Sequence, residues 1–195
     1  MSGLGSAVAL LGTSADPPSK GHQVLLSRLC ERYSQVATWA SDNPLKHHAA
    51  PLAVRTQLLK ALVDDIQVPE LSLKQELSSP WALTTLERAA FLWPQQELVF
   101  VVGSDLAGQI PRWKQADQLL QRCTLAIAPR DGWTLEPTTV DTLTALGGRV
   151  ALLDFSVPAS ASSAIRQAPL EADIPRKVWP LLLKHNLYGL SGSVC

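Results

Sequence analysis

The 195-residue chain has few charged side chains. Asp, Glu, Lys and Arg make up 17% of it, and 17 basic residues balance 17 acidic ones. An average soluble domain carries about 25% charged residues. A protein that binds duplex nucleic acid through bulk charge would be basic, so this composition argues against a nucleic-acid partner. Hydrophobic residues reach 46%, which excludes a disordered or collagen-like chain and suits a single domain with a sizeable core.

Cysteines and long apolar runs are also scarce. The three cysteines, Cys30, Cys123 and Cys195, lie far apart and form no CxxC or Cys/His spacing. The sequence therefore predicts neither a zinc site nor a disulfide framework, and an odd cysteine count suits a reducing compartment. The apolar run at 7–11 is too short for a signal peptide or a membrane helix. We expect a cytoplasmic protein without a membrane partner, and no sequence feature indicates an oligomeric state.

What is present is an alternation of short apolar runs with amphipathic segments of helical length, which is typical of βαβ units. The expected strands lie at 7–11, 36–39, 98–102, 124–128 and 150–153, with a sixth candidate at 66–68. The expected helices cover 21–33, 84–93, 115–122 and 140–146, with others starting at Pro51 and Pro175. Thr84 and Glu87 have the spacing of a capping box for the expected helix at 84–93.

The pattern predicts an α/β fold: a Rossmann-like, doubly wound and mostly parallel sheet of five or six strands, with helices on both faces. We expect one domain over 1–195, with a short C-terminal helical part from about residue 160. In such a sheet ligands bind beyond the carboxyl ends of the strands. Candidate functional residues should therefore follow the apolar runs.

The loop after the first strand is the first such place. Gly12 would let a ligand approach the backbone closely, and Gly21 and His22 stand at the start of the next helix, where free N–H groups attract phosphate. We expect Thr13 and Ser14 to take part as well. The loop contains no GxxxxGK[ST] motif, and its composition also fits an ordinary connection between a strand and a helix.

The loop after the expected strand at 36–39 contains Lys46, which can pair with a phosphate as a point charge. His47 and His48 are adjacent, so their side chains diverge, and we expect solvated loop histidines rather than metal ligands. Arg55 lies on the following helix, either on its surface or facing the phosphate site.

Gly103 and Asp105 follow the clearest strand, where a carboxylate suits a ribose hydroxyl, a hydrated cation or a helix cap. Trp113, a little further on, either stacks on a flat ring or anchors the core. Arg130 follows the next strand, within reach of a nucleotide phosphate.

Ser162 and Ser163 precede Arg166 by about one helical turn. Hydroxyls and N–H groups at a helix start, with an arginine one turn on, suit phosphate oxygens. Several such places, all beyond strand ends, favour nucleotide binding. There is no GxSxG elbow and no convincing Ser/His/Asp order, which disfavours a covalent hydrolase.

These segments, in this order along nearly the whole chain, resemble the bacterial nicotinate-nucleotide adenylyltransferases, which belong to the nucleotidyltransferase superfamily with a (His/Thr)-x-Gly-His motif. Residues 12–22 are similar to the family's Gly-Gly-Thr-Phe-Asp-Pro-x-His-x-Gly-His, and 162–166 to its Ser-Ser/Thr-x-Ile-Arg signature. Residues 43–46, 84–86 and 100–105 resemble weaker family segments. Ser19 stands where the family usually has its first His, and Pro80-Trp81-Ala82 replaces a usual Ser-Tyr-Thr.

The resemblance implies transfer of AMP from ATP to nicotinate mononucleotide, giving nicotinate adenine dinucleotide and pyrophosphate in NAD biosynthesis. It implies Mg²⁺ as a companion of ATP, with no metal site on the protein. The catalytic residues that it implies are His22, Ser19 and Arg166. The implied ATP and phosphate ligands are Gly12, Thr13, Ser14, Gly21, Lys46, Gly103, Asp105, Arg130, Ser162 and Ser163.

Thr85 and Trp113 are the implied pyridine-nucleotide ligands. A helix start near Thr85 would favour the nicotinate carboxylate over a neutral amide, so we expect a preference for nicotinate over nicotinamide mononucleotide. Two alternatives remain open. One is adenylyl transfer to another phosphate, such as phosphopantetheine, and the other is nucleotide binding without turnover, which Ser19 favours.

Overall fold

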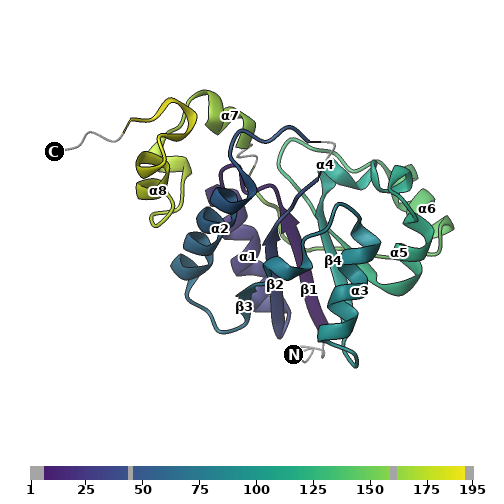
Figure 1. The fold of residues 1–195 in the computed structure, drawn as a ribbon. Coiled ribbons are helices and arrows are strands. Elements are labelled where there is room, and N and C mark those ends of the chain that lie inside the picture. The colour runs from purple at the N-terminus through teal and green to yellow at the C-terminus, as the bar shows by residue number, and fades with distance from the viewer. Residues whose placement is uncertain (1–6, 44–45, 159–161, 192–195) are drawn as a thin grey trace.

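A six-stranded parallel sheet forms the centre of the molecule (Figure 1). The computed structural model describes residues 7–43, 46–158 and 162–191. The strands are β1 (Ala7–Thr13), β2 (Gln35–Ala40), β3 (Leu71–Leu73), β4 (Glu97–Gly103), β5 (Thr124–Ala128) and β6 (Arg149–Leu152). Their order is β3-β2-β1-β4-β5-β6, which confirms the doubly wound, Rossmann-like sheet.

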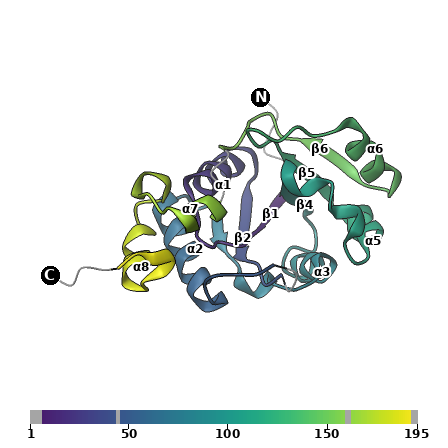
Figure 2. The same cartoon turned by 90° about the horizontal axis from the view of Figure 1, so that it is seen from above.

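Helices cover both faces of this sheet, as predicted (Figure 2). One face carries α1 (Lys20–Arg32) and α2 (Leu52–Ile66), and the other carries α3 (Ala82–Leu92), α5 (Ala116–Arg122) and α6 (Pro137–Ala145). The short helix α4 (Ser104–Ala107) follows β4 directly. The C-terminal part holds α7 (Ser162–Gln167), α8 (Trp179–Lys184) and the single turns η3 (Glu171–Asp173) and η4 (Leu187–Gly189), and it lies beside α2.

The central strands are apolar throughout because both of their faces are buried. In β1, Ala9 and Leu11 join the core under α1 and α2, whereas Val8 and Leu10 join the core under α3, α5 and α6. This two-sided burial explains why β1 and β4 were the easiest elements to predict. The two hydrophobic cores position the strand ends on which the site is built.

Four predicted elements differ from the structure. The helix expected at 140–146 is α6, which begins three residues earlier at Pro137. The candidate strand at 66–68 instead contains the end of α2, which stops at Gln67 in a left-handed conformation (φ 58°), and the sixth strand is β3. Helix α3 starts two residues before Thr84, so Thr84 and Glu87 form no capping box. The last helix starts at Trp179 rather than near Pro175, with Pro180 in its first turn, where a proline's missing N–H costs nothing.

No helix in the described ranges is long and apolar enough to span a membrane. Cys30 and Cys123 are free thiols, and burial raises the pKa of each to about 11. The third cysteine, Cys195, lies outside the described residues.

Candidate active site

The candidate site lies where the strand order reverses, between β1 and β4. The chain runs outward from β1 to β3 on one side and from β4 to β6 on the other. In sheets of this kind ligands bind in the crevice at such a reversal, beyond the carboxyl ends of the two central strands. The loop at 12–19 leaves β1 there, and Ser104 and Asp105 begin α4 there. Residues from four separate segments of the sequence are thereby brought to one edge.

Ser19 and His22 form a reciprocal cap at the start of α1. The backbone N–H of Ser19 donates to Nδ1 of His22 at 3.1 Å, and the hydroxyl of Ser19 lies 2.9 Å from the same nitrogen. The backbone N–H of His22 in turn donates to the Ser19 side chain. Because a backbone N–H can only donate, Nδ1 must accept, and the proton of a neutral His22 ring is therefore on Nε2.

The imidazole of His22 is neutral at physiological pH. Burial and, to a smaller extent, the positive charge of Arg130 lower its pKa to about 4, against the opposing effect of Asp105. The position in the first turn of α1, near the positive end of the helix dipole, acts in the same direction. His22 therefore offers an N–H donor, rather than a cation, to a ligand in the crevice.

Asp105 and Arg130 form an ion pair, and the charges of both act on the pKa of His22. Nη1 of Arg130 donates to Oδ2 of Asp105 at 3.0 Å, with both side chains about a quarter exposed. The hydroxyl of Ser104 accepts the backbone N–H of Arg130 at 3.1 Å, which fixes the start of that loop. A Cβ on Gly103 would collide with the carboxylate of Asp105, so a larger residue there would displace that side chain.

Helix α7 is bound to the first loop. The hydroxyl of Ser162 donates to the carbonyl of Pro17 at 2.9 Å, and Nη1 of Arg166 donates to the carbonyl of Asp16 at 2.6 Å. The Ser-Ser-x-Ile-Arg segment thus lies against the first loop, although residues 159–161 lie outside the described ranges. Ser163 is exposed on the same helix.

The space directly above Gly12 is filled by the indole of Trp39. A Cβ on Gly12 would lie 2.8 Å from two ring carbons of Trp39. The group that closely approaches the Gly12 backbone is therefore an aromatic side chain. Thr13 is nearly buried and its hydroxyl accepts the N–H of Ala15 at 3.2 Å. Gly21 is buried in the first turn of α1. Contact of Gly12, Thr13 and Gly21 with phosphate stays a prediction.

Arg55 is neither on the surface nor in the phosphate site. Its side chain is 1% exposed and donates to three main-chain carbonyls, those of Ala50 at 3.0 Å and of Ser14 and Ser41 at 2.8 Å each. Burial lowers its pKa, and the nearby Asp16 opposes this. Arg55 thus fixes the loops that follow β1 and β2. The carbonyl of Ser14 is used in this way, and its contact with phosphate stays a prediction.

The two adjacent histidines of the loop after β2 differ in their exposure to solvent. Lys46 and His47 are exposed, as expected, and residues 44–45 of that loop lie outside the described ranges. His48 contradicts the expectation of a solvated side chain, because only 12% of it is exposed and its Nε2 is buried with no hydrogen-bond partner among the described residues. Burial and the charge of Arg55 lower its pKa. Its Nδ1 lies 3.9 Å from Oδ2 of Asp16.

Asp16 was missed by sequence analysis as a residue of its own. Its carboxylate is 1% exposed and accepts the N–H groups of Ala49 at 2.7 Å and Ala50 at 3.1 Å, as well as the hydroxyl of Tyr188 at 2.6 Å. The only sequence signal was an aspartate before a proline in a glycine-containing loop. Its partners are 33 to 172 residues away, so no local pattern could identify them.

The two predicted pyridine ligands lie on the face of the sheet that α3 covers. Thr85 is 2% exposed, its hydroxyl donates to the carbonyl of Leu77 at 2.9 Å, and its N–H donates to the carbonyl of Trp81 at 3.1 Å. Thr85 thus anchors the first turn of α3, and its direct contact with a ligand stays a prediction. Trp113 is half-buried and meets Phe100 edge-on at 6.3 Å between ring centroids.

These aromatic side chains continue to Gly12. Phe100 also contacts Trp39 edge-on at 6.4 Å, so a row of three rings joins the first loop to Trp113. Next to Trp113, the ammonium of Lys114 lies 4.6 Å above the ring of Trp81, at the cap of α3.

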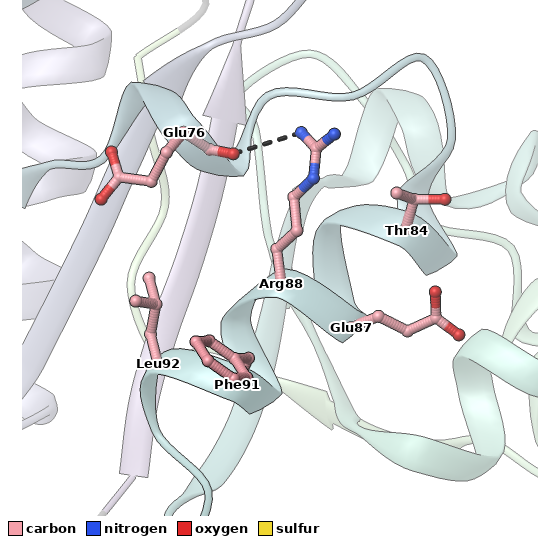
Figure 3. Close-up of a pocket in the computed structure, with 6 residues that line it drawn as sticks. All are labelled: Glu76, Thr84, Glu87, Arg88, Phe91 and Leu92. Atoms are coloured by element: carbon pink, nitrogen blue, oxygen red, sulfur yellow. Dashed lines mark hydrogen bonds between the residues drawn. The ribbon is translucent and has the colours of Figure 1, made fainter.

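A surface hollow on the outer side of α3 lies apart from these residues. Figure 3 shows Arg88 donating to the carbonyl of Glu76 across it, at 3.2 Å. Its lining residues are Glu76, Thr84, Glu87, Arg88, Phe91 and Leu92. None of them was predicted as a site residue, and none lies at the carboxyl end of a strand.

Comparison with known proteins identifies the family. A family model described as cytidylyltransferase-like matches residues 10–168. The chain is 35% identical, over 196 aligned residues, to the probable nicotinate-nucleotide adenylyltransferase of Synechocystis sp., with 93% of this chain and 98% of the relative covered. The chain belongs to the nicotinate-nucleotide adenylyltransferase family. The resemblance stated from the sequence motifs is thereby confirmed.

One further relative and one solved structure are also similar to this chain. The probable nicotinate-nucleotide adenylyltransferase of Chlorobaculum tepidum is 28% identical over 93% of this chain and 98% of its own. The structure of Plasmodium falciparum nicotinic acid mononucleotide adenylyltransferase complexed with NaAD superposes with a TM-score of 0.75, covering 95% of this chain and 98% of that one. At 16% identity, the Plasmodium structure demonstrates the shared fold.

Proposed function

We propose that this protein transfers the AMP part of ATP to nicotinate mononucleotide, forming nicotinate adenine dinucleotide and pyrophosphate. The observation that carries the proposal is the meeting of a neutral His22 donor with the Asp105–Arg130 pair at the switch point of the sheet. The similarity of the whole chain supports the same proposal, since 93% of it aligns with a family member at 35% identity.

The reaction needs no nucleophile from the protein. An oxygen of the nicotinate mononucleotide phosphate attacks the α-phosphorus of ATP, and a new P–O bond forms there. The bond from the α-phosphorus to the oxygen that bridges it to the β-phosphorus breaks, and pyrophosphate leaves with that electron pair. Such a transfer depends on alignment of the two phosphates and on stabilisation of the charge that develops.

The site supplies both. Nε2–H of His22 is fixed in direction by its Nδ1 contacts with Ser19, and it would donate to a phosphate oxygen most strongly in the transition state. Arg166, Arg130 and Lys46 would provide positive charge around the three ATP phosphates. Ser162 and Ser163 would add hydroxyl or N–H donors at the start of α7.

Mg²⁺ would enter as part of the substrate, bound to the phosphates of ATP. The described residues contain no cluster of three His, Cys, Asp or Glu side chains able to hold a metal ion. The carboxylate of Asp16 is occupied by three donors, and Asp105 is paired with Arg130. The carboxylates of Asp16 and Asp105 therefore do not form a binding site for a resident cation.

The pyridine end of the acceptor would lie between Trp113 and the start of α3, beside Thr85. Stacking on Trp113 would hold the ring, and the N–H groups of the first turn of α3 would favour a carboxylate over a carboxamide. The ammonium of Lys114, close to Trp81, adds positive charge on the same side. Nicotinate mononucleotide should therefore be preferred over nicotinamide mononucleotide.

Pyrophosphate release from ATP and Mg²⁺ tests the proposal, with nicotinate mononucleotide, nicotinamide mononucleotide, phosphopantetheine or no acceptor. We expect release with the first, and a fall in kcat of about a hundredfold or more in His22→Ala, the usual loss for one transition-state donor. His47→Ala is the matched control, since His47 is exposed and has no proposed role. Equal turnover of both mononucleotides would refute the specificity argument. ATP binding without turnover on any acceptor would refute the reaction itself.

A further inference from the structure

Tyr188 reaches the candidate site from the far end of the chain. It lies in the single turn η4, where its backbone adopts a left-handed conformation (φ 55°). Bulky residues rarely adopt that conformation, which persists only where surrounding contacts compensate for it. The contact that meets this need is the hydrogen bond of its hydroxyl to Oδ1 of Asp16, at 2.6 Å across 172 residues.

Asp16 is the point where three segments of the site meet. Its carboxylate accepts N–H groups of Ala49 and Ala50, in the loop that carries Lys46, and its main-chain carbonyl accepts Nη1 of Arg166. The side chain is 1% exposed, so it is not open to direct contact with a ligand. Asp16 therefore acts on a ligand through the residues that it holds.

Two further positively charged or chargeable groups lie near the same carboxylate. Nη1 of Arg166 is 4.0 Å from Oδ2 of Asp16, and Nδ1 of His48 is 3.9 Å from that oxygen. Both distances are too long for a hydrogen bond. The three hydrogen bonds from Ala49, Ala50 and Tyr188 hold the carboxylate in an orientation that leaves the guanidinium of Arg166 on the main-chain carbonyl of Asp16.

We infer that Tyr188 is a positioning residue for adenylyl transfer: it anchors the Asp16 carboxylate, keeps it from forming a direct hydrogen bond with Arg166, and so leaves Arg166 directed at the ATP phosphates. The inference rests on the proposed function, since it assigns to Arg166 the role of a phosphate ligand. Without the hydroxyl, Oδ1 of Asp16 loses a charge-assisted hydrogen bond, and its best replacement partner is the guanidinium of Arg166.

The hydroxyl is suited to this task at any pH at which the enzyme would work. Burial, together with the hydrogen bond to Asp16, raises the pKa of Tyr188 far above its usual value, so the O–H remains a donor. The other groups that face the carboxylate are His48 from the loop after β2, Arg55 from α2 and Arg166 from α7.

Tyr188→Phe tests the inference, because it removes one oxygen and keeps the ring. We expect kcat/KM for ATP to fall about tenfold, the scale of one lost hydrogen bond to a charged group. KM for nicotinate mononucleotide should stay within about twofold, because Thr85 and Trp113 lie on the other face of the sheet. Tyr33→Phe is the matched control: Tyr33 is the only other tyrosine and lies at the far end of α1.

A double-mutant cycle with Arg166→Ala identifies the route. If Tyr188 acts through Arg166, Tyr188→Phe should cost less than about twofold in the Arg166→Ala background. A full tenfold further loss in that background, or a loss shared equally by the KM values of both substrates, would overturn the inference. Wild-type values in Tyr188→Phe would also overturn it.

The increase in melting temperature produced by MgATP provides a readout that requires no acceptor. It should be smaller in Tyr188→Phe than in wild type and unchanged in Tyr33→Phe, and an equal increase in both variants would count against the inference. If wild type is stabilised by MgATP but turns over no mononucleotide, the proposed function fails, while the comparison of the two tyrosine variants still decides the role of Tyr188.

Discussion

Gly12→Ala is the substitution whose effect the structure specifies most closely. The added Cβ would lie 2.8 Å from Cε2 and Cζ2 of Trp39 and 2.9 Å from its Nε1. Carbon atoms in van der Waals contact are about 3.5–4.0 Å apart. The indole or the β1 backbone must therefore move by roughly 0.5–1 Å. Trp39 is only 3% exposed and contacts Phe100, so it cannot turn towards solvent.

Overpacking of this kind costs about 1–3 kcal/mol. In a domain of this size, 1 kcal/mol lowers the melting temperature by about 2–4 °C. We therefore expect Gly12→Ala to melt roughly 2–12 °C below wild type. Because Trp39 contacts Phe100, which contacts Trp113, the displacement should also raise KM for nicotinate mononucleotide.

Thermal unfolding of a small set of variants can test the cause. Gly108→Ala is the matched control, since a Cβ there meets nothing within 4 Å and Gly108 has an ordinary helical φ of −67°. Trp39→Phe removes Nε1 and Cζ2, so Gly12→Ala should cost at least about 1 kcal/mol less in that background. Equal melting temperatures for Gly12→Ala and Gly108→Ala would refute the packing argument, as would strict additivity of Gly12→Ala with Trp39→Phe.

Two further predictions concern His22 and Arg55. With a pKa near 4, His22 should keep a constant NMR shift between pH 5 and 8, its signal being assigned as the one lost in His22→Asn. Between about pH 4 and 6.5 the unfolded chain binds a proton at His22 that the folded chain does not. Wild type should therefore gain stability over His22→Asn as pH rises through that window, by at most about 3 kcal/mol; a titration midpoint near 6.5 would contradict this. Arg55→Lys replaces a guanidinium that serves three carbonyls, so we expect a loss of about 2–4 kcal/mol in urea denaturation. Arg28→Lys, at an exposed pair with Glu31, should change stability by less than about 0.5 kcal/mol, and similar losses in both variants would disprove the role of Arg55.

The parts of the fold that could be predicted are those in which the local sequence and the tertiary environment agree. β1 and β4 are buried on both faces and so carry continuous apolar runs. β3 has only three residues, too few for a pattern, and its position depends on pairing with β2 between Val36 and Thr38. The start of α3 was misplaced because Trp81, which caps it, forms no side-chain cap hydrogen bond and resembles no standard cap.

The site divides along the same line. The positions of His22, Asp105 and Arg130 could be predicted because each follows a strand or lies in the first turn of a helix, and Arg166 lies one turn after Ser162 in α7. Their contact with a ligand stays a prediction. The burial of the His48 side chain and the contacts of Asp16 could not be predicted. They depend on residues from α2, α7 and η4 that meet only in the folded chain.

The departure at Ser19 is the feature in which sequence and structure inform each other most. From the sequence, a hydroxyl in place of the family's first histidine suggested either a substitute phosphate ligand or a lost activity. In the structure Ser19 is fully buried, its N–H and hydroxyl lie on Nδ1 of His22, and its side chain receives the N–H of His22. Its atoms thus determine the tautomer and direction of the histidine that the motif retains. Positive charge on the phosphates would then have to come from Lys46, Arg130 and Arg166, which makes the position of Arg166, and the Tyr188–Asp16 contact behind it, more important to catalysis in this chain.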